Sequence, residues 1–307
     1  MKQNTRKAKC ILCLSAPPIP ESHIFPAFIV RWMKKNAPVN QLRWSQQPNK
    51  PEQDAWKADY LCAECEQKLS KVENAFKQQI YDHVVARRPG TFRYDESVGA
   101  AVLSLFFRHL QFAMDVGSLQ GSVSPARLLD DLRLKLNATL NGGADWASLY
   151  ALPLDFDPQA HRYGPGYNQY LLTLDAYWFD YCLPEHDPFW IGAVKLPLLQ
   201  LVFSERPLEE ITTNGSHRKE LAGCRIEKSG AMAIPSVSTV IMELLGDNYV
   251  RRSAEIHGSL QPLSERQVQK IRDEISKHPD PYATVFHEAA LADAQIAGAE
   301  DTWVHGE

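Results

Sequence analysis

The sequence predicts an α+β fold in two parts, a small N-terminal module of residues 1–90 and a larger mixed α+β domain of residues 91–307. Two Cys-x-x-Cys pairs occur, both in the first part. Apolar residues recur at helical spacing in several segments, whereas the runs between residues 148 and 235 are typical of strands. A chain of 307 residues with 44% apolar side chains is long enough for a small module joined to a larger core.

In the N-terminal part, residues 10–26 form a first cysteine turn, a proline-rich turn and a stretch that contains His23. Residues 26–35 predict a helix, and residues 36–58 predict a loop or a short hairpin arm. Residues 60–88 begin with the second cysteine pair and continue as one long helix up to Pro89. The apolar faces of these two helices are predicted to consist of Phe28, Ile29, Trp32 and Met33, and of Leu69, Val72, Phe76, Ile80 and Val84.

In the second part, residues 97–116 are apolar nearly all round and predict a buried helix. Ser124 and Pro125 supply an N-cap and a first-turn proline for a helix that ends near residue 140. Residues 148–235 favour strands, above all the runs at residues 170–183 and 189–203. Further helices are predicted at residues 236–246, 264–277 and 282–298.

Charge is distributed unevenly between the two parts. Residues 1–90 carry 15 Lys and Arg against 8 Asp and Glu, whereas residues 91–307 carry 18 against 29. A basic module on an acidic body indicates local docking of a polyanion, although solvated lysines give the same pattern. The N-terminus has no signal-peptide core, and no apolar run reaches the roughly 18 to 20 residues of a membrane span. We therefore expect a cytoplasmic protein that does not enter a membrane.

Four cysteines have the spacing of a metal site. Cys10, Cys13, Cys62 and Cys65 form two Cys-x-x-Cys pairs with 48 residues between them. Two such turns complete a closed tetrahedral site suited to structural Zn²⁺, and the alternative is a set of reduced, unligated thiols. Cys182 and Cys224 are isolated, so we expect both to be buried thiols.

Two short stretches beside these cysteines carry a resemblance to a known family. "SHIFP" at residues 22–26 follows the first pair, "LCAECE" at residues 61–66 contains the second, and a helix continues from it. This arrangement resembles the HNH endonuclease family in its treble-clef, ββα-metal form, over about residues 8–85. The resemblance implies a metal-dependent hydrolase of phosphodiester bonds in nucleic acid, with DNA favoured over RNA.

The resemblance assigns roles by position. His23 would be the general base that activates a water molecule, since imidazole titrates near neutral pH. A catalytic Mg²⁺ or Mn²⁺ would bind through Ser22, before the base, and Glu66, after the last cysteine. The family commonly has an acidic residue or His where Ser22 stands, and Asn or His where Glu66 stands. Glu73 lies seven residues beyond Glu66 on about the same helix face and is a candidate for a second oxygen ligand.

Partners are expected from the same reasoning. The basic side chains predicted to contact nucleic-acid phosphates are Lys34, Lys35, Arg43, Lys68 and Lys71. Such contacts position a backbone rather than read bases, so sequence preference would be weak. The second part would sense a signal, form homo-oligomers or bind a regulatory partner, as in nucleases of prokaryotic defence systems and mobile elements.

Other interpretations of these residues stay open at this stage. His23 could be a structural histidine, and Glu66 and Glu73 could be helix-surface acids. In that case the module would be a non-catalytic zinc-binding unit that binds nucleic acid or protein. The sequence has no nucleophile elbow and no phosphate-cradling glycine loop that would favour another chemistry.

Overall fold

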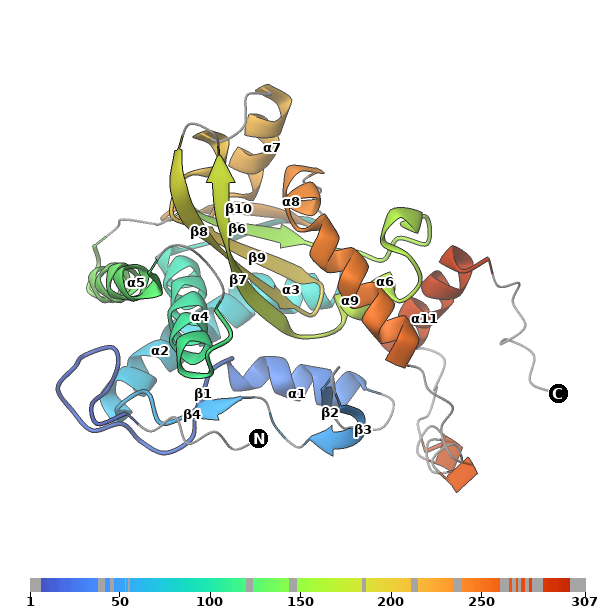
Figure 1. Cartoon of the computed structure of the whole chain (residues 1–307), viewed down its shortest axis with the longest axis horizontal. Helices are drawn as coiled ribbons and strands as arrows, with labels where there is room; N and C mark the ends of the chain where they lie inside the picture. Colours follow the sequence, from blue (N-terminus) through green and yellow to red (C-terminus); the bar gives the residue numbers. More distant parts are fainter. Residues whose placement is uncertain are drawn as a thin grey trace. The chain divides into compact units, whose positions relative to one another are not determined.

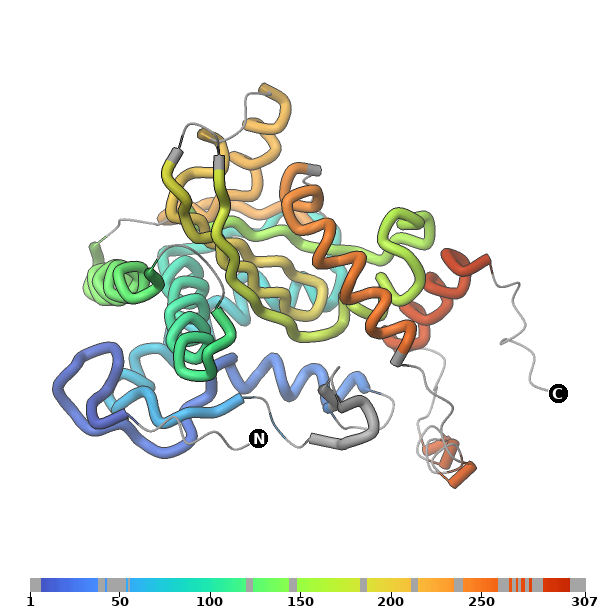
Figure 2. Tube along the Cα trace, viewed as in Figure 1, coloured from blue at the N-terminus to red at the C-terminus, as the bar shows by residue number. Residues whose placement is uncertain are grey.

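The structure is a computed structural model with the mixed helices and antiparallel strands of an α+β protein, as the sequence predicts. The residues that it describes are 7–37, 42–44, 47–52, 54, 56–119, 124–143, 148–183, 186–210, 215–234, 239–259 and 284–298, with single positions and pairs between 265 and 277. The helix predicted at residues 264–277 therefore lies largely outside the described residues. Figure 1 shows the elements, and Figure 2 follows the same chain as a tube.

The chain divides into two compact units that do not follow the expected boundary at residue 90. The larger unit comprises residues 1–27, 55–154 and 174–240, and the smaller unit comprises residues 28–54, 155–173 and 241–307. The cysteine-bearing module and the main sheet thus belong to one unit. The physical reason is a long apolar helix, α4 (Glu96–Asp115), which packs against the helix of the module as well as against the sheet.

The larger unit contains helices, short strands and the four strands of one antiparallel sheet. They are β1 (Ser22–His23), β4 (Lys57–Ala58), α2 (Ala63–Phe76), the π-helical turn η1 (Lys77–Tyr81), α3 (Asp82–Val85), β5 (Gly90–Tyr94), α4, α5 (Pro125–Leu140), β6 (Ser148–Pro153), β7 (Asp175–Leu183), β8 (His186–Leu196), β9 (Leu199–Ser204), η3 (Leu208–Glu210), α7 (Gly215–Cys224) and β10 (Gly230–Ile234). A further helix, α8 (Thr239–Leu244), spans the boundary between the units.

The helix predicted over residues 60–88 is confirmed as a continuous run of α2, η1 and α3. Of its predicted apolar face, Leu69, Phe76, Ile80 and Val84 are buried and Val72 is half-buried. The π-helical turn interrupts this run at its centre, and it shifts the helical phase between the two ends. The predicted helices at residues 97–116 and 125–140 are confirmed as α4 and α5.

The main sheet has four antiparallel strands in the order β6-β9-β8-β7. Helix α4 lies against it, and Trp178 of β7 fills the contact by packing on Phe106 of α4 and Phe203 of β9 (Figure 1). Gly192 of β8 lies directly under this indole: a Cβ atom there would meet the ring at 2.7 Å. Any side chain at position 192 would therefore push Trp178 out of its contact with α4.

Helix α4 is, among the described residues, the one helix with the length and composition of a membrane span. In its apolar window 83% of the residues are buried inside the protein. That is the burial of a core helix, and it explains the nearly continuous apolar character of its sequence. The expected cytoplasmic location stays a prediction.

His109 lies at the centre of the contact between α4 and the sheet. Its Nδ1 accepts a hydrogen bond from the Trp178 Nε1–H at 3.0 Å, and its ring lies beside Phe25 and Trp56. Because the imidazole is almost fully buried, the cost of desolvating its charged form lowers its pKa to about 3. The neutral ring thus joins the sheet to the residues just after β1 and just before β4.

This buried imidazole predicts acid sensitivity. An unfolded histidine has a pKa of about 6.5, so below that pH the unfolded state binds a proton that the folded state excludes. Above about pH 6.5, His109 should not lower the free energy of unfolding. Between about pH 6.5 and pH 3, we expect this residue to lower it by at most about 1.4 kcal/mol per pH unit. Urea denaturation of wild type and His109→Gln at pH 7 and pH 5 tests this, because glutamine accepts the same hydrogen bond without titrating. An equal loss of stability in both proteins would assign the acid sensitivity to other groups.

The smaller unit consists of helices and one short hairpin. Its elements are α1 (Ala27–Asn36), which begins at the boundary, β2 (Leu42–Trp44), β3 (Gln47–Glu52), η2 (His161–Tyr163), α6 (Tyr167–Leu171), α9 (Gly246–Ser259) and α11 (Val285–Ile296). The predicted helix at residues 26–35 and the hairpin arm are confirmed by α1 and by the antiparallel pair β2–β3. Asp293 of α11 is buried and accepts hydrogen bonds from the backbone N–H groups of Asn168 and Gln169, so it caps the first turn of α6.

Several expectations for residues 148–298 need correction. The run at residues 170–183 is a strand only from Asp175 onward, because Tyr167–Leu171 form α6. Residues 215–224 form α7 inside the region expected to be strands. The predicted helices at 236–246 and 282–298 are confirmed as α8 and α11, but α9 lies where no helix was expected. Of the two isolated cysteines, Cys224 is buried as predicted and Cys182 is exposed.

Candidate active site

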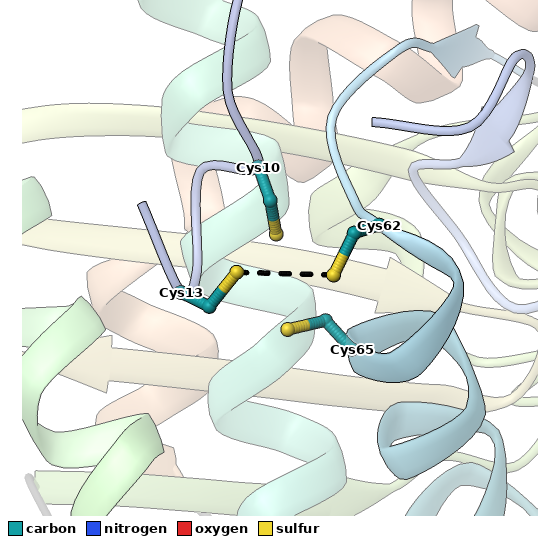
Figure 3. A group of neighbouring side chains, drawn as sticks. All are labelled: Cys10, Cys13, Cys62 and Cys65. Atoms are coloured by element: carbon teal, nitrogen blue, oxygen red, sulfur yellow. Dashed lines mark hydrogen bonds between the residues drawn. The ribbon is translucent and has the colours of Figure 1, made fainter. Parts of the chain in front are cut away.

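The four paired cysteines come together in the larger unit. Cys10 and Cys13 lie in a turn closed by a hydrogen bond from the Leu14 N–H to the Cys10 carbonyl (2.9 Å), Cys62 is the N-cap of α2 and Cys65 lies in its first turn. Their Sγ atoms all lie within 4.8 Å of one another, and Cys13 and Cys62 are 3.8 Å apart (Figure 3). Tetrahedral zinc with Zn–S bonds of about 2.3 Å places its sulfur atoms about 3.8 Å apart. The cluster therefore fits structural zinc, and among the described residues it is the one group of three or more such ligands close enough to hold a metal ion.

The electrostatics of the cluster also favour a cation. Burial raises the pKa of Cys10 and of Cys65. Burial alone would also raise the pKa of Cys13, but hydrogen bonds from the Ser15 hydroxyl and from the Ser15 and Ala16 backbone lower it to about 6. Thiolates that are buried need a positive charge beside them. A bound Zn²⁺ would supply that charge and would displace the thiol protons.

The two cysteine turns are joined by backbone hydrogen bonds as well as by their side chains. The Ile11 N–H donates to the Tyr60 carbonyl at 2.9 Å, and the Ile19 N–H donates to the Leu61 carbonyl at 2.8 Å. In Figure 2 the dark blue N-terminal segment accordingly runs beside the lighter blue segment that leads into α2. These bonds make a frame in which the chain before β1 is held against the chain after β4.

His23 lies on β1, which pairs antiparallel with β4, so that His23 is opposite Lys57 and Ser22 is opposite Ala58. The preceding residue, Glu21, adopts a left-handed backbone conformation with φ of 57°. Its N–H donates to Asp59 Oδ1 at 2.9 Å, which holds the strand entry in this uncommon conformation. Ser22 is buried and His23 is half-buried, so the imidazole is at the edge of the frame.

Glu66, in the first turns of α2, faces the same place. Burial raises the pKa of its carboxyl, Glu73 raises it further, and the charges of Arg108 and His23 together with the Ser22 hydroxyl oppose the rise. Ser22 Oγ and Glu66 Oε2 are both buried, and the two side chains lie close enough for the Ser22 hydroxyl to lower the pKa of the Glu66 carboxyl. A carboxylate and a hydroxyl offer oxygen ligands of the kind that a hard divalent ion prefers.

Glu73, the other predicted oxygen ligand, is engaged differently. Its Oε1 forms an ion pair with Nη2 of Arg108, a residue of α4 that is 1% exposed. A divalent cation would have to compete with this guanidinium for the carboxylate. The structure therefore places Ser22, His23 and Glu73 where each influences the Glu66 carboxyl, and it pairs Glu73 with Arg108.

The predicted phosphate-binding residues are divided between the two units. Lys68 and Lys71 are exposed on α2, and Lys68 pairs with Glu64 at 2.7 Å. Lys34 and Lys35 lie on α1 and Arg43 lies on β2, all in the smaller unit. The larger unit thus offers two of the five beside the frame, together with Lys57 opposite His23.

Sequence reasoning missed Arg108 because the ion pair joins residues 35 positions apart and lies outside the two motifs. A signal was present in the run "SLFFRHLQF", where one arginine and one histidine interrupt a helix that is otherwise apolar. A charged side chain in a helix that must be buried requires a partner, and the nearest acidic residues of the module are on α2. That requirement alone did not say which acid would pair with it.

The arrangement offers a four-cysteine cluster, a half-buried imidazole, a carboxylate beside a buried hydroxyl, and a buried arginine that pairs with Glu73. A neutral imidazole can accept a proton, and a carboxylate beside a buried hydroxyl can hold a divalent cation. Comparisons of the chain with protein-family models, with curated proteins and with solved structures gave no match.

Proposed function

We propose that this protein is a metal-dependent endonuclease and that the His23 site is its active centre. The observation that supports it most directly is the grouping of the half-buried His23 with the buried oxygen atoms Ser22 Oγ and Glu66 Oε2, since both His23 and Ser22 influence the Glu66 carboxyl. A site of this composition suits hydrolysis of a phosphodiester, which needs a base for water and a cation for the phosphate.

In this proposal each residue of the site has one task. The His23 imidazole accepts the proton of the attacking water, and the β1–β4 ladder holds it at the edge of the frame. Ser22 Oγ and Glu66 Oε2 would hold Mg²⁺ or Mn²⁺, which when bound would neutralise phosphate charge and stabilise the leaving oxygen. Lys57, Lys68 and Lys71 would contact the backbone of nucleic acid without reading its bases, and DNA is the proposed substrate.

A second candidate function is a non-catalytic zinc module that binds nucleic acid or protein. The ion pair between Glu73 and Arg108 favours it, because this pair leaves Glu66 as the one acidic ligand near His23 among those that the sequence proposed. One carboxylate and one hydroxyl form a weak site for a divalent cation unless substrate phosphate completes the coordination.

Cleavage by the purified, zinc-loaded protein decides between these candidates. Single- and double-stranded DNA and RNA are incubated with Mg²⁺ or Mn²⁺, and we expect double-stranded DNA to be cut. Glu66→Gln is expected to lower the rate by about a hundredfold, because it removes the charged ligand of the cation. The matched control is Glu64→Gln on the same helix turn, where the carboxylate is exposed and pairs with Lys68, and it should stay within about twofold of wild type.

Equal rates for Glu66→Gln and Glu64→Gln would remove Glu66 from the site. Absence of cleavage by wild type on all four substrates with both metals, together with binding of one of them, would favour the non-catalytic module.

A further inference from the structure

Arg108 makes an unusually complete set of contacts for a residue outside the predicted module. Its Nη1 donates to the His23 carbonyl at 2.8 Å, its Nη2 pairs with Glu73, and its Nε donates to the Ser104 carbonyl at 3.2 Å. A further hydrogen bond joins Nη2 to Ser104 Oγ at 3.3 Å. The planar guanidinium thus joins the strand of the base to the helix of the carboxylates, while its own helix holds it in place.

The burial of Arg108 rules out direct contact with a substrate phosphate, because only 1% of the residue is exposed. Its effect on the site must pass through the residues that it touches. It restrains the backbone of His23, and it occupies the Glu73 oxygen that the helix would otherwise offer to a cation.

The charges of the site add a second consequence. Glu66, Glu73 and Arg108 influence one another electrostatically, and together they carry a net charge of −1 when both acids are ionised. Without the guanidinium the net charge would be −2, and two carboxylates would face one cation. Buried arginine therefore weakens the affinity of the site for a divalent ion while it fixes the geometry of the base.

We infer that Arg108 is a positioning residue that fixes the His23 strand and withholds Glu73 from the cation, so that Glu66 and Ser22 alone bind it. This inference rests on the proposed function of the same site. It predicts that removal of Arg108 strengthens cation binding and slows cleavage, a combination that loss of structure does not produce.

The test measures Mn²⁺ binding to the full-length, zinc-loaded protein. The spectroscopic signal of free Mn²⁺ reports how much of the ion stays unbound. Arg108→Gln should bind Mn²⁺ roughly tenfold more tightly than wild type, because the repelling charge is gone and Glu73 is released. The double variant Arg108→Gln with Glu73→Gln restores the net charge of −1 and should return to about the wild-type affinity. Glu73→Gln alone brings the net charge to zero and should bind most weakly.

Cleavage rates at saturating Mn²⁺ supply the second readout. Arg108→Gln and the double variant should both be slower than wild type by roughly tenfold or more, because the His23 carbonyl has lost its donor. Arg108→Lys keeps the charge but not the planar fork, so its Mn²⁺ affinity should match wild type while its rate falls.

Arg108→Gln that binds Mn²⁺ no more tightly than wild type overturns the inference. If Arg108→Gln does not fold, the double variant is compared with Glu73→Gln, because these two proteins also differ by the Arg108 charge alone. The inference then requires the double variant to bind Mn²⁺ more tightly than Glu73→Gln. A wild-type protein that never cleaves nucleic acid would refute the proposed function, yet the order of Mn²⁺ affinities would still decide the role of Arg108.

Discussion

Substitution of His23 by alanine is expected to lower the rate of metal-dependent DNA cleavage by about 10² to 10⁴-fold, the usual contribution of a general base. The fold should survive, because the contacts of this residue with Arg108 and with β4 use its backbone, which alanine retains. Plasmid nicking with Mg²⁺ or Mn²⁺, followed over time for the folded variant, measures the effect.

The matched control is His161→Ala, at an exposed position of the smaller unit, which should cleave at the wild-type rate. Added imidazole should restore part of the activity of His23→Ala but not of Glu66→Gln, because it replaces a base and not a cation ligand. Cleavage by His23→Ala at more than about a tenth of the wild-type rate would place the base elsewhere.

Loss of zinc is expected to be the most damaging change to stability. Chelation, or the substitution Cys62→Ser, should release zinc and lower the free energy of unfolding by several kcal/mol, since structural zinc in small modules is worth about 10 kcal/mol or more. Cys62 is both a ligand and the N-cap of α2, so its loss should also loosen the start of the helix that carries Glu66. Metal analysis combined with thermal unfolding checks both effects.

The matched control for the zinc ligands is Cys182→Ser, because Cys182 is exposed and outside the cluster. It should keep its zinc and change the free energy of unfolding by less than about 0.5 kcal/mol, as is usual for surface substitutions. A Cys62→Ser protein with wild-type zinc content and stability would contradict the assignment of the four cysteines to one metal ion.

The sequence predicted those parts of the structure that depend on local spacing. Cys-x-x-Cys turns bring two thiols together by themselves, and the helical repeat of Leu69, Phe76 and Ile80 defines a buried face without any knowledge of its partner. Short apolar runs were ambiguous. The stretch around Leu171 was assigned to a strand and is the end of helix α6, because burial makes both kinds of segment apolar.

The contacts that modify the candidate site are not local. Neither the ion pair of Glu73 with Arg108 nor the hydrogen bond of His109 with Trp178 has a spacing that a sequence pattern can reveal, because each joins residues on different elements. The compact unit that extends past residue 90 has the same origin. It depends on which face of α4 packs against α2, and that is decided in three dimensions.

Helix α4 also determines whether the segment with the four-cysteine cluster can fold apart from the rest of the chain. At its C-terminal end Asp115 accepts hydrogen bonds from the Tyr60 hydroxyl and from Lys7, both at 2.6 Å, and near its middle it supplies Arg108. A truncation after residue 90 would strip the frame of these anchors and expose the apolar face of α2 to water. Gene fusions or truncations that preserve the frame must therefore carry α4 with it, so the first 90 residues are not a transferable part on their own.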